Sequence, residues 1–177
     1  MALRPIRTYP DPVLAVPTQP VAAIDAEVRE LVRDMAETMY AAPGIGLAAN
    51  QVGVGRRVAV IDPGDPKVHQ GLIVLINPEI VEREGQIVWE EGCLSLPGVY
   101  EDVERAESVA VRALDLDGRE RTIRAQGLLA VAIQHEIDHL DGVLLLDHFS
   151  SLKRNLLKRR LRREALERQK DGASATG

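Results

Sequence analysis

The chain has 177 residues, of which 45% are apolar and 3% are aromatic. This composition suits one globular domain whose core is filled by aliphatic side chains. A single cysteine, Cys93, excludes an intramolecular disulfide, and no apolar run approaches the roughly 20 residues that span a bilayer. The first residues lack a continuous apolar stretch, so we expect no secretory signal and a cytoplasmic location.

Charge is distributed unevenly along the chain. The net charge is −5, but residues 150–170 contain nine Lys or Arg against two Glu. This segment carries +7 and the remainder carries −12. We therefore expect an acidic body over residues 1–150 and a basic C-terminal helix with a tail over residues 151–177, both within one domain.

The N-terminal third contains an extended, proline-rich segment followed by a predicted helix over residues 24–40. Apolar residues recur there at helical spacing, Asp25 is suited to cap the N-terminus, and Pro43 and Gly44 end the pattern.

The middle of the chain predicts strands. Residues 56–63, 72–81 and 86–91 are rich in β-branched residues. Residues 107–127 alternate in polarity on both sides of Asp117-Gly118, which indicates a hairpin.

Two helices are predicted in the last third. Residues 128–142 form an apolar segment that closes at Asp141-Gly142, and a leucine-containing amphipathic segment starts at Ser150. We expect the latter to pack Leu152, Leu156 and Leu161 on the body. Strands between helices without βαβ alternation favour an α+β fold, with antiparallel sheets around the 128–142 helix and a C-terminal amphipathic helix.

The first of these helices contains an HExxH pattern, "HEIDH". His135 and His139 are four residues apart and therefore share one helical face, where both imidazoles can bind one metal ion. Glu136 follows the first histidine and can act as a general base toward an activated water. A chance match on a charged helix is the structural alternative, but the residues before Gln134 are strongly apolar.

A third ligand must come from elsewhere, because catalytic sites of this kind usually have three protein ligands. Leu145 occupies the position where a metzincin has its last histidine, and His148 lies further along. Glu164 and Glu167 lie in the basic segment, where ion pairs explain them better. Cys93, which directly follows a predicted strand, is the favoured ligand, although a lone cysteine is often only a small buried hydrophobe.

Three stretches carry a family resemblance. "GIGLAANQ" at residues 44–51, "EGCLS" at 91–95 and "QHEIDH" at 134–139 resemble, in order and separation, the signature motifs of peptide deformylase. The resemblance extends over nearly the whole chain up to the last helix. It implies an enzyme of protein biosynthesis, a hydrolase that removes the formyl group from formyl-methionine of newly synthesised polypeptides through metal-activated water.

The resemblance also implies roles for individual residues. The ligands would be Cys93, His135 and His139, and Glu136 would be the general acid/base. The Gln51 side-chain amide and the Leu94 backbone N–H would hold the formyl oxygen. One divalent ion is implied, Fe²⁺ in the physiological state, with Zn²⁺, Ni²⁺ or Co²⁺ able to replace it. We expect Glu91 to orient a neighbouring ligand, with Arg105 as its partner.

Substrate contacts follow from glycine freedom and from the family pattern. We expect an extended peptide to bind between Ile45-Gly46 and a loop at Pro97-Gly98. By the family pattern, Leu128, Val131 and Ala132 would line a methionine pocket. Turn formation by the glycines and plain core packing by the three apolar residues are the structural alternatives.

The implied partners are N-formylmethionyl nascent peptides and, through the basic helix, the ribosome. We expect no membrane or DNA partner and a monomer. Two other functions stay open: a general HExxH metallopeptidase, and a non-catalytic ribosome-associated metal-binding module.

Overall fold

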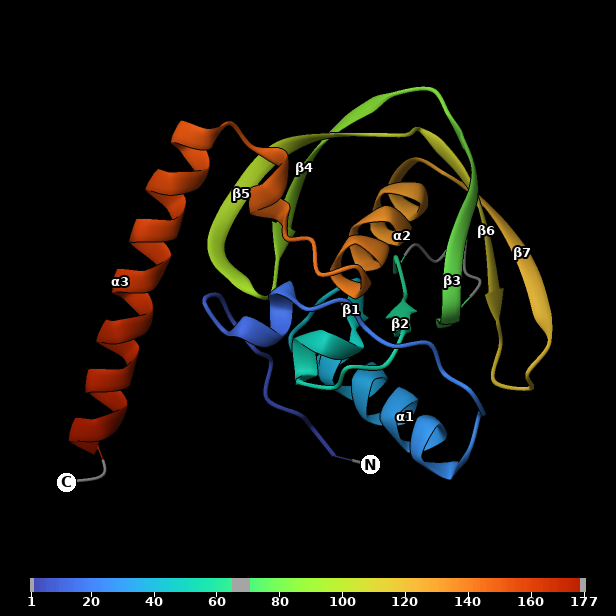
Figure 1. Cartoon of the computed structure of the whole chain (residues 1–177), viewed down its shortest axis with the longest axis horizontal. Coiled ribbons are helices and arrows are strands. Elements are labelled where there is room, and N and C mark those ends of the chain that lie inside the picture. Colours follow the sequence, from blue (N-terminus) through green and yellow to red (C-terminus); the bar gives the residue numbers. More distant parts are fainter. Residues whose placement is uncertain (1, 65–70, 176–177) are drawn as a thin grey trace.

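The computed structural model describes residues 2–64 and 71–175 and shows an α+β protein with antiparallel sheets (Figure 1). The helices are η1 (Pro12–Ala15), α1 (Ala26–Ala41), η2 (Ala49–Val52), α2 (Gly127–Leu140), η3 (Leu145–His148) and α3 (Ser151–Ala175). The strands are β1 (Gly46–Ala48), β2 (Val58–Ile61), β3 (Ile73–Glu84), β4 (Ile87–Cys93), β5 (Leu96–Arg105), β6 (Ser108–Leu114) and β7 (Glu120–Gln126). The predicted class is confirmed.

Two sheets enclose α2. Five strands follow the order β1-β2-β3-β6-β7, while β4 and β5 pair separately, and every pair of these strands is antiparallel. In Figure 1, β3 and β4 form a long arch, with α2 beneath it. The predicted hairpin is confirmed, because β6 and β7 pair on either side of Gly118, whose φ of 78° suits a glycine at a tight turn.

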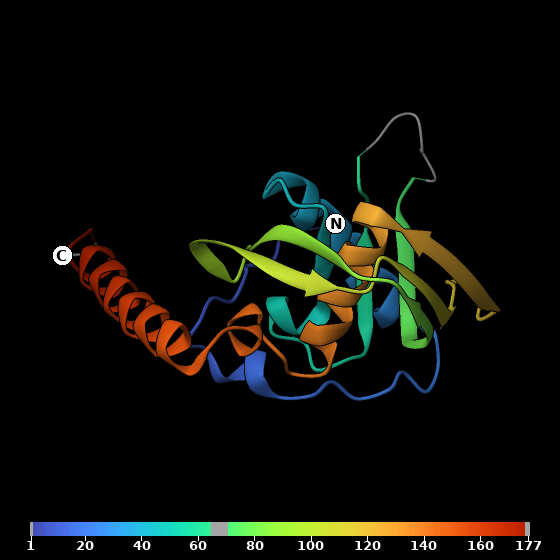
Figure 2. The ribbon, with the colours of Figure 1, turned by 90° about the horizontal axis from the view of Figure 1, so that it is seen from above.

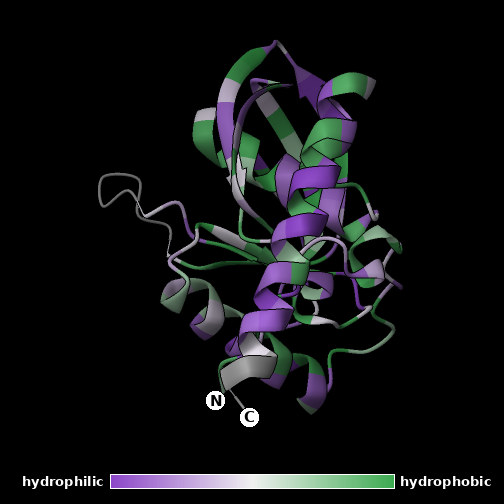
Figure 3. Ribbon diagram, turned by 90° about the vertical axis from the view of Figure 1, so that its left-hand side faces the viewer, coloured by the Kyte–Doolittle hydropathy of each residue, from purple (hydrophilic) through white to green (hydrophobic). Residues whose placement is uncertain are grey.

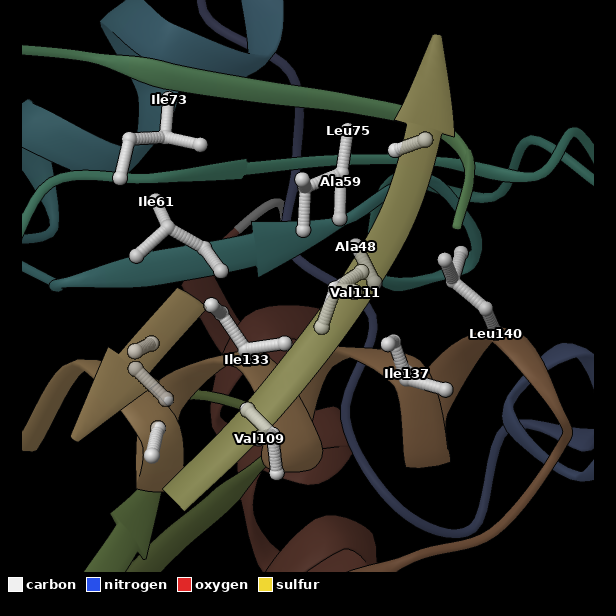
Figure 4. Close-up of a cluster of buried hydrophobic side chains, with 14 residues drawn as sticks. Ala48, Ala59, Ile61, Ile73, Leu75, Val109, Val111, Ile133, Ile137 and Leu140 are labelled. Atoms are coloured by element: carbon white, nitrogen blue, oxygen red, sulfur yellow. The ribbon is translucent and has the colours of Figure 1, made fainter. Parts of the chain in front are cut away.

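The central core forms between α2 and the larger sheet. Ile133, Ile137 and Leu140 of α2 face Ala48 and Val111 of the sheet in Figure 4, and all five are buried. This packing holds α2 rigidly, so polar residues elsewhere on the helix have defined positions.

The predicted first helix is confirmed, but it begins two residues later and ends one residue later than the predicted range 24–40. The Asp25 carboxylate accepts a hydrogen bond from the Val28 backbone N–H at 3.0 Å, and the apolar stripe of α1 is buried. Gly142 follows the C-terminal end of α2 and has a φ of 76°. A Cβ there would lie 2.8 Å from the Ala15 carbonyl oxygen, so the close approach also requires glycine.

Strand β5 was not predicted from the sequence. Pro97 and Gly98 indicated a loop, but both lie inside the strand, which pairs with β4 from Ile87–Arg105 to Cys93–Leu96. Proline is tolerated here because β5 is an edge strand and Pro97 lies near its first residue.

The packing predicted for the C-terminal helix was wrong at two leucines. Leu161 is 1% exposed and packs against the body, whereas Leu152 and Leu156 are 73% and 57% exposed. The physical reason is helical geometry, because Leu157 and Leu161 lie on the opposite side of the helix and contact the body instead. Figure 2 shows α3 extending away from the body, and the colouring of Figure 3 shows that the residues of α3 are largely hydrophilic. In the described part of the chain, every helix is too short or too polar to cross a membrane.

Candidate metal centre

Three side chains from two elements converge on one point. His135 and His139 lie one turn apart on α2, with their Nε2 atoms 3.1 Å apart. Cys93, the last residue of β4, places its Sγ 3.2 Å from His139 Nε2. The three ligand atoms all lie within 4.8 Å of one another, and no other such group of three occurs among the described residues.

The electrostatics of this cluster favour a cation. Burial raises the pKa of the Cys93 thiol, but the charges and hydrogen bonds of His139 and His135 outweigh it, and the pKa falls well below its usual range. The thiolate is the form of cysteine that binds metals. Two imidazole nitrogens and one thiolate are a donor set for zinc, iron, nickel or cobalt with an open fourth position, so these residues fit such an ion.

The orientation of His135 is set by a carboxylate. Glu91 Oε1 lies 2.9 Å from His135 Nδ1. Because a carboxylate only accepts, Nδ1 carries the proton and Nε2 is left to face Cys93 and His139. Burial raises the pKa of Glu91, but His135 and Arg105 outweigh this and lower it below its usual range.

Glu91 is itself held by a buried arginine, as the sequence predicted. Arg105 donates from Nε to Glu91 Oε2 at 2.8 Å and from Nη2 to Oε1 at 2.9 Å, and both residues are buried. A bidentate pair of this kind fixes the carboxylate plane, which in turn fixes the imidazole of His135.

Gln51 directs an amide nitrogen toward the cluster. Its Oε1 accepts from the Ala48 backbone N–H at 3.0 Å, so Nε2 must point the other way. Nε2 lies 3.0 Å from Ser95 Oγ and 3.8 Å from Cys93 Sγ. The short helix η2 therefore positions a hydrogen-bond donor beside the ligands.

Glu136 is buried beside the same cluster. Its Oε2 has no hydrogen-bond partner within the described part of the chain. Burial raises the pKa of this carboxyl group above its usual range, more than the nearby His135 and His139 lower it. Gly46 makes room for the side chain, because a Cβ at Gly46 would lie 2.6 Å from Glu136 Oε1.

A pocket of about 310 Å³ opens over these groups. The residues expected to be catalytic or to contact substrate line it except for Pro97 and Gly98, together with Trp89, Glu90 and Tyr100 of the small sheet. Its lining includes Ile45, Gly46, Gln51, Trp89, Glu90, Cys93, Leu94, Tyr100, Leu128, Val131, Ala132, His135 and Glu136. Pro97 and Gly98 are not part of this lining; both lie in β5, where the Gly98 carbonyl accepts from Arg160 Nη2 at 3.4 Å.

Residues 3–155 match the sequence family described as polypeptide deformylase. The chain belongs to this family. It is 56% identical to the peptide deformylase of Alkalilimnicola ehrlichii over 96% of this chain and 93% of the relative. It is 51% identical to that of Thermodesulfovibrio yellowstonii over 92% and 98% of the two chains.

Solved structures of deformylases have the same fold. A crystal structure of a peptide deformylase from Legionella pneumophila matches with a TM-score of 0.86 at 44% identity, over 96% of this chain and 98% of the other. One from Ehrlichia chaffeensis, in complex with actinonin, matches with a TM-score of 0.87 at 39% identity, over 93% and 98%. The chain is therefore an enzyme of the deformylase family.

Trp89, Glu90 and Tyr100 were missed as pocket residues of this deformylase. A usable signal was present, because β4 leads directly into Cys93 and its preceding residues therefore approach the ligand cluster. Tyr100 could not be placed without its pairing partner, Gly92. A Cβ at Gly92 would lie 2.6 Å from the Tyr100 ring, so glycine allows the ring to lie across the strand.

Proposed function

We propose that this deformylase hydrolyses the formyl group of N-terminal formyl-methionine on newly synthesised polypeptides. One observation carries the proposal: Cys93, His135 and His139 converge within 4.8 Å of one another beside a single pocket, which Gln51 and Glu136 also line. A general metallopeptidase and a non-catalytic metal-binding module are both disfavoured by the family membership.

Cys93, His135 and His139 would hold one divalent ion, which we propose to be Fe²⁺. When bound, the ion supplies Lewis acidity and lowers the pKa of water from 15.7 toward about 7. The anionic, soft sulfur of Cys93 suits iron as well as zinc, nickel or cobalt. Glu91 keeps the His135 nitrogen available to the ion by holding the proton on Nδ1, 2.9 Å away.

Glu136 would move the protons of the reaction. Its raised pKa brings the carboxyl group closer to neutral pH, where one residue can both accept and donate a proton. The unpartnered Oε2 is free to accept a proton from water in the pocket and to pass it to the departing amine.

Gln51 and Leu94 would hold the formyl oxygen. Gln51 Nε2 is held near Cys93 by the anchoring of Oε1, and the Leu94 backbone N–H directly follows the cysteine. Two preorganised donors stabilise the negative charge that develops on this oxygen, and loss of one such donor typically costs about 10²–10³ in rate.

Leu128, Val131 and Ala132 would bind the methionine side chain on the apolar wall of the pocket, and Trp89 extends this wall. The peptide would continue past Ile45 and Gly46. The family pattern and the lining support this arrangement, but Pro97 and Gly98 lie outside the pocket lining and are not included.

Formate release separates the proposed activity from peptidase activity. We expect the iron-loaded enzyme to release formate from formyl-Met-Ala-Ser and to leave unformylated Met-Ala-Ser intact. Cleavage of the unformylated peptide, or no formate release from the formylated one, would contradict the proposal.

The identity of the ion can be tested by aeration. Metal analysis after anaerobic purification is expected to find iron. Oxygen oxidises both ferrous iron and thiolates, so the iron form should lose activity in air while a nickel form keeps it. Unchanged activity of the iron form after prolonged aeration would contradict the assignment.

We further propose that α3 docks the enzyme on ribosomal RNA. The helix extends from the body, and residues 150–170 carry nine basic against two acidic side chains, which favours a polyanionic partner. Ribosomes should carry the full chain into the pellet at low salt and release it at high salt. Binding that survives deletion of residues 151–177 would contradict the proposal.

A further inference from the structure

The ion-pair network around Arg105 continues beyond Glu91, away from the ligand cluster. Arg105 Nη1 donates to Asp138 Oδ2 at 2.6 Å, and the same oxygen lies 2.8 Å from His148 Nε2. Five side chains therefore form one continuous path: His135, Glu91, Arg105, Asp138 and His148.

The direction of each hydrogen bond in this path is determined by its acceptors. Ionised Asp138 can only accept, so His148 Nε2 must carry a proton. His148 Nε2 also lies 3.5 Å from Arg105 Nη1, and since both atoms are donors, they share Asp138 Oδ2 rather than bind each other. Burial raises the pKa of Asp138, but His148 and Arg105 outweigh this and keep it below its usual range.

Arg105 separates two pockets. The first is lined by Glu91 and by the ligands Cys93 and His135; the second has a volume of about 360 Å³ and is lined by Arg105, Gln134, Asp138 and His148 among others. The two linings have no residue in common. The Arg105 side chain is 5% exposed, while Asp138 and His148 are 27% and 30% exposed. The path therefore connects the buried metal centre with a solvent-accessible pocket on another face of the protein.

Because the guanidinium group of arginine is planar, the contact of Arg105 with Asp138 affects its contact with Glu91. One edge of the Arg105 guanidinium, Nε and Nη2, contacts Glu91, and the remaining nitrogen, Nη1, contacts Asp138. Because the group is rigid, a contact at Nη1 also restricts the edge that holds Glu91. His148 in turn holds the Asp138 oxygen that receives Nη1.

We propose that Asp138 and His148 are positioning residues of the metal centre, which act on His135 through Arg105 and Glu91. The proposal deepens the proposed function, since it relies on metal binding by Cys93, His135 and His139. It predicts that substitutions at Asp138 or His148 weaken metal binding although neither side chain is a ligand.

The chain contains a matched control. Asp138 and Asp141 both flank the ligand His139, and each forms an ion pair with an arginine, at 2.6 Å to Arg105 and 2.7 Å to Arg57. Only Asp138 is connected to the ligands by the path. Asp138→Ala and Asp141→Ala thus remove the same group from the same end of α2.

The experiment measures release of Zn²⁺ from the loaded full-length protein to an excess of chelator. We expect Asp138→Ala to release zinc about 10-fold faster than wild type, the lower end of the effects of outer-shell residues. Asp141→Ala should remain within about 2-fold. His148→Leu should accelerate release about 3-fold, and His148→Gln, which keeps an N–H donor, should restore the wild-type rate.

The proton on His135 Nδ1 gives a second readout that a purely structural role would not move. In NMR spectra of the zinc form, its hydrogen bond to Glu91 should produce a downfield signal. We expect this signal to shift upfield and exchange faster in Asp138→Ala and His148→Leu, but not in Asp141→Ala or His148→Gln.

Equal zinc release and an unchanged Nδ1–H signal in Asp138→Ala and Asp141→Ala would overturn the proposal and show that the Arg105–Asp138 ion pair does not act on the metal centre. If Asp138→Ala does not fold, the two His148 variants decide, and equal behaviour of Leu and Gln overturns it. Formate release is measured separately. A protein without deformylase activity whose zinc release follows this pattern would refute the proposed function and retain the positioning role.

Discussion

Helices α2 and α3 differ in the burial of their polar side chains. In α2, four polar or charged side chains are buried or half-buried with defined partners: Gln134, His135, Asp138 and His139. In α3, most of the basic residues are exposed, and Leu161 is the only buried residue whose side chain is described. Burying polar groups is costly unless they are paired, so the buried and paired polar residues of α2 mark it as the helix that carries the chemistry.

The largest effect is expected from substitution of Glu136, the most buried acidic residue of α2. Glu136→Gln should reduce kcat for formate release by about 10²–10⁴, because general acid–base catalysis is removed while the ligands remain. Metal content measured beside activity should stay unchanged. Glu164→Gln on α3 is the control and should retain wild-type kcat; comparable activity of the Glu136→Gln enzyme would show that Glu136 is not the general acid/base.

Substitution of Gly46 tests the space that the Glu136 side chain of α2 needs. Gly46→Ala should lower kcat/KM about 10²-fold, since a Cβ 2.6 Å from Glu136 Oε1 must displace the carboxylate. Gly55→Ala serves as the control, because a Cβ there meets nothing within 4 Å. Equal kinetics of the two variants would show that Glu136 tolerates displacement.

Stability should distinguish the two sides of α3. Leu161→Ala removes a side chain that is 1% exposed and should lower the free energy of unfolding by about 2 kcal/mol or more. Leu156→Ala, at 57% exposure, should change it by less than about 0.5 kcal/mol. Denaturant titration measures both, and equal losses would mean that Leu156 also packs on the body.

The smallest effect is expected from the exposed charges of α3. Arg159→Glu combined with Arg163→Glu should leave formate release within about 2-fold of wild type and the free energy of unfolding within about 0.5 kcal/mol. A large loss of deformylase activity on a free tripeptide would show that α3 takes part in catalysis.

Local features were predictable because their geometry is short-range. Four-residue spacing places His135 and His139 together on any α-helix, and the Asp25 cap and the turn at Gly118 depend only on neighbouring residues. Strand β5 was missed because Pro97 and Gly98 imitate a loop, and only pairing with β4 makes the segment extended.

Two further features were decided by packing. The leucines of α3 form two stripes, and the sequence alone could not say that Leu157 and Leu161 would face the body. Likewise, the sequence predicted Arg105 as the partner of Glu91, but the burial of Arg105 and its second contact, with Asp138, depend on the fold.

The ligand types, the helix that carries two of them and the family could be predicted from the sequence, since these depend on residue identity and local spacing, and Cys93 was already the favoured third ligand. The folded chain was needed to bring Cys93 Sγ to 3.2 Å from His139 Nε2, to place Pro97 and Gly98 outside the pocket lining, and to connect Arg105 with Asp138 and His148. Contacts between distant segments depend on which arrangement buries the most apolar surface while pairing every buried charge, and that balance belongs to the whole chain.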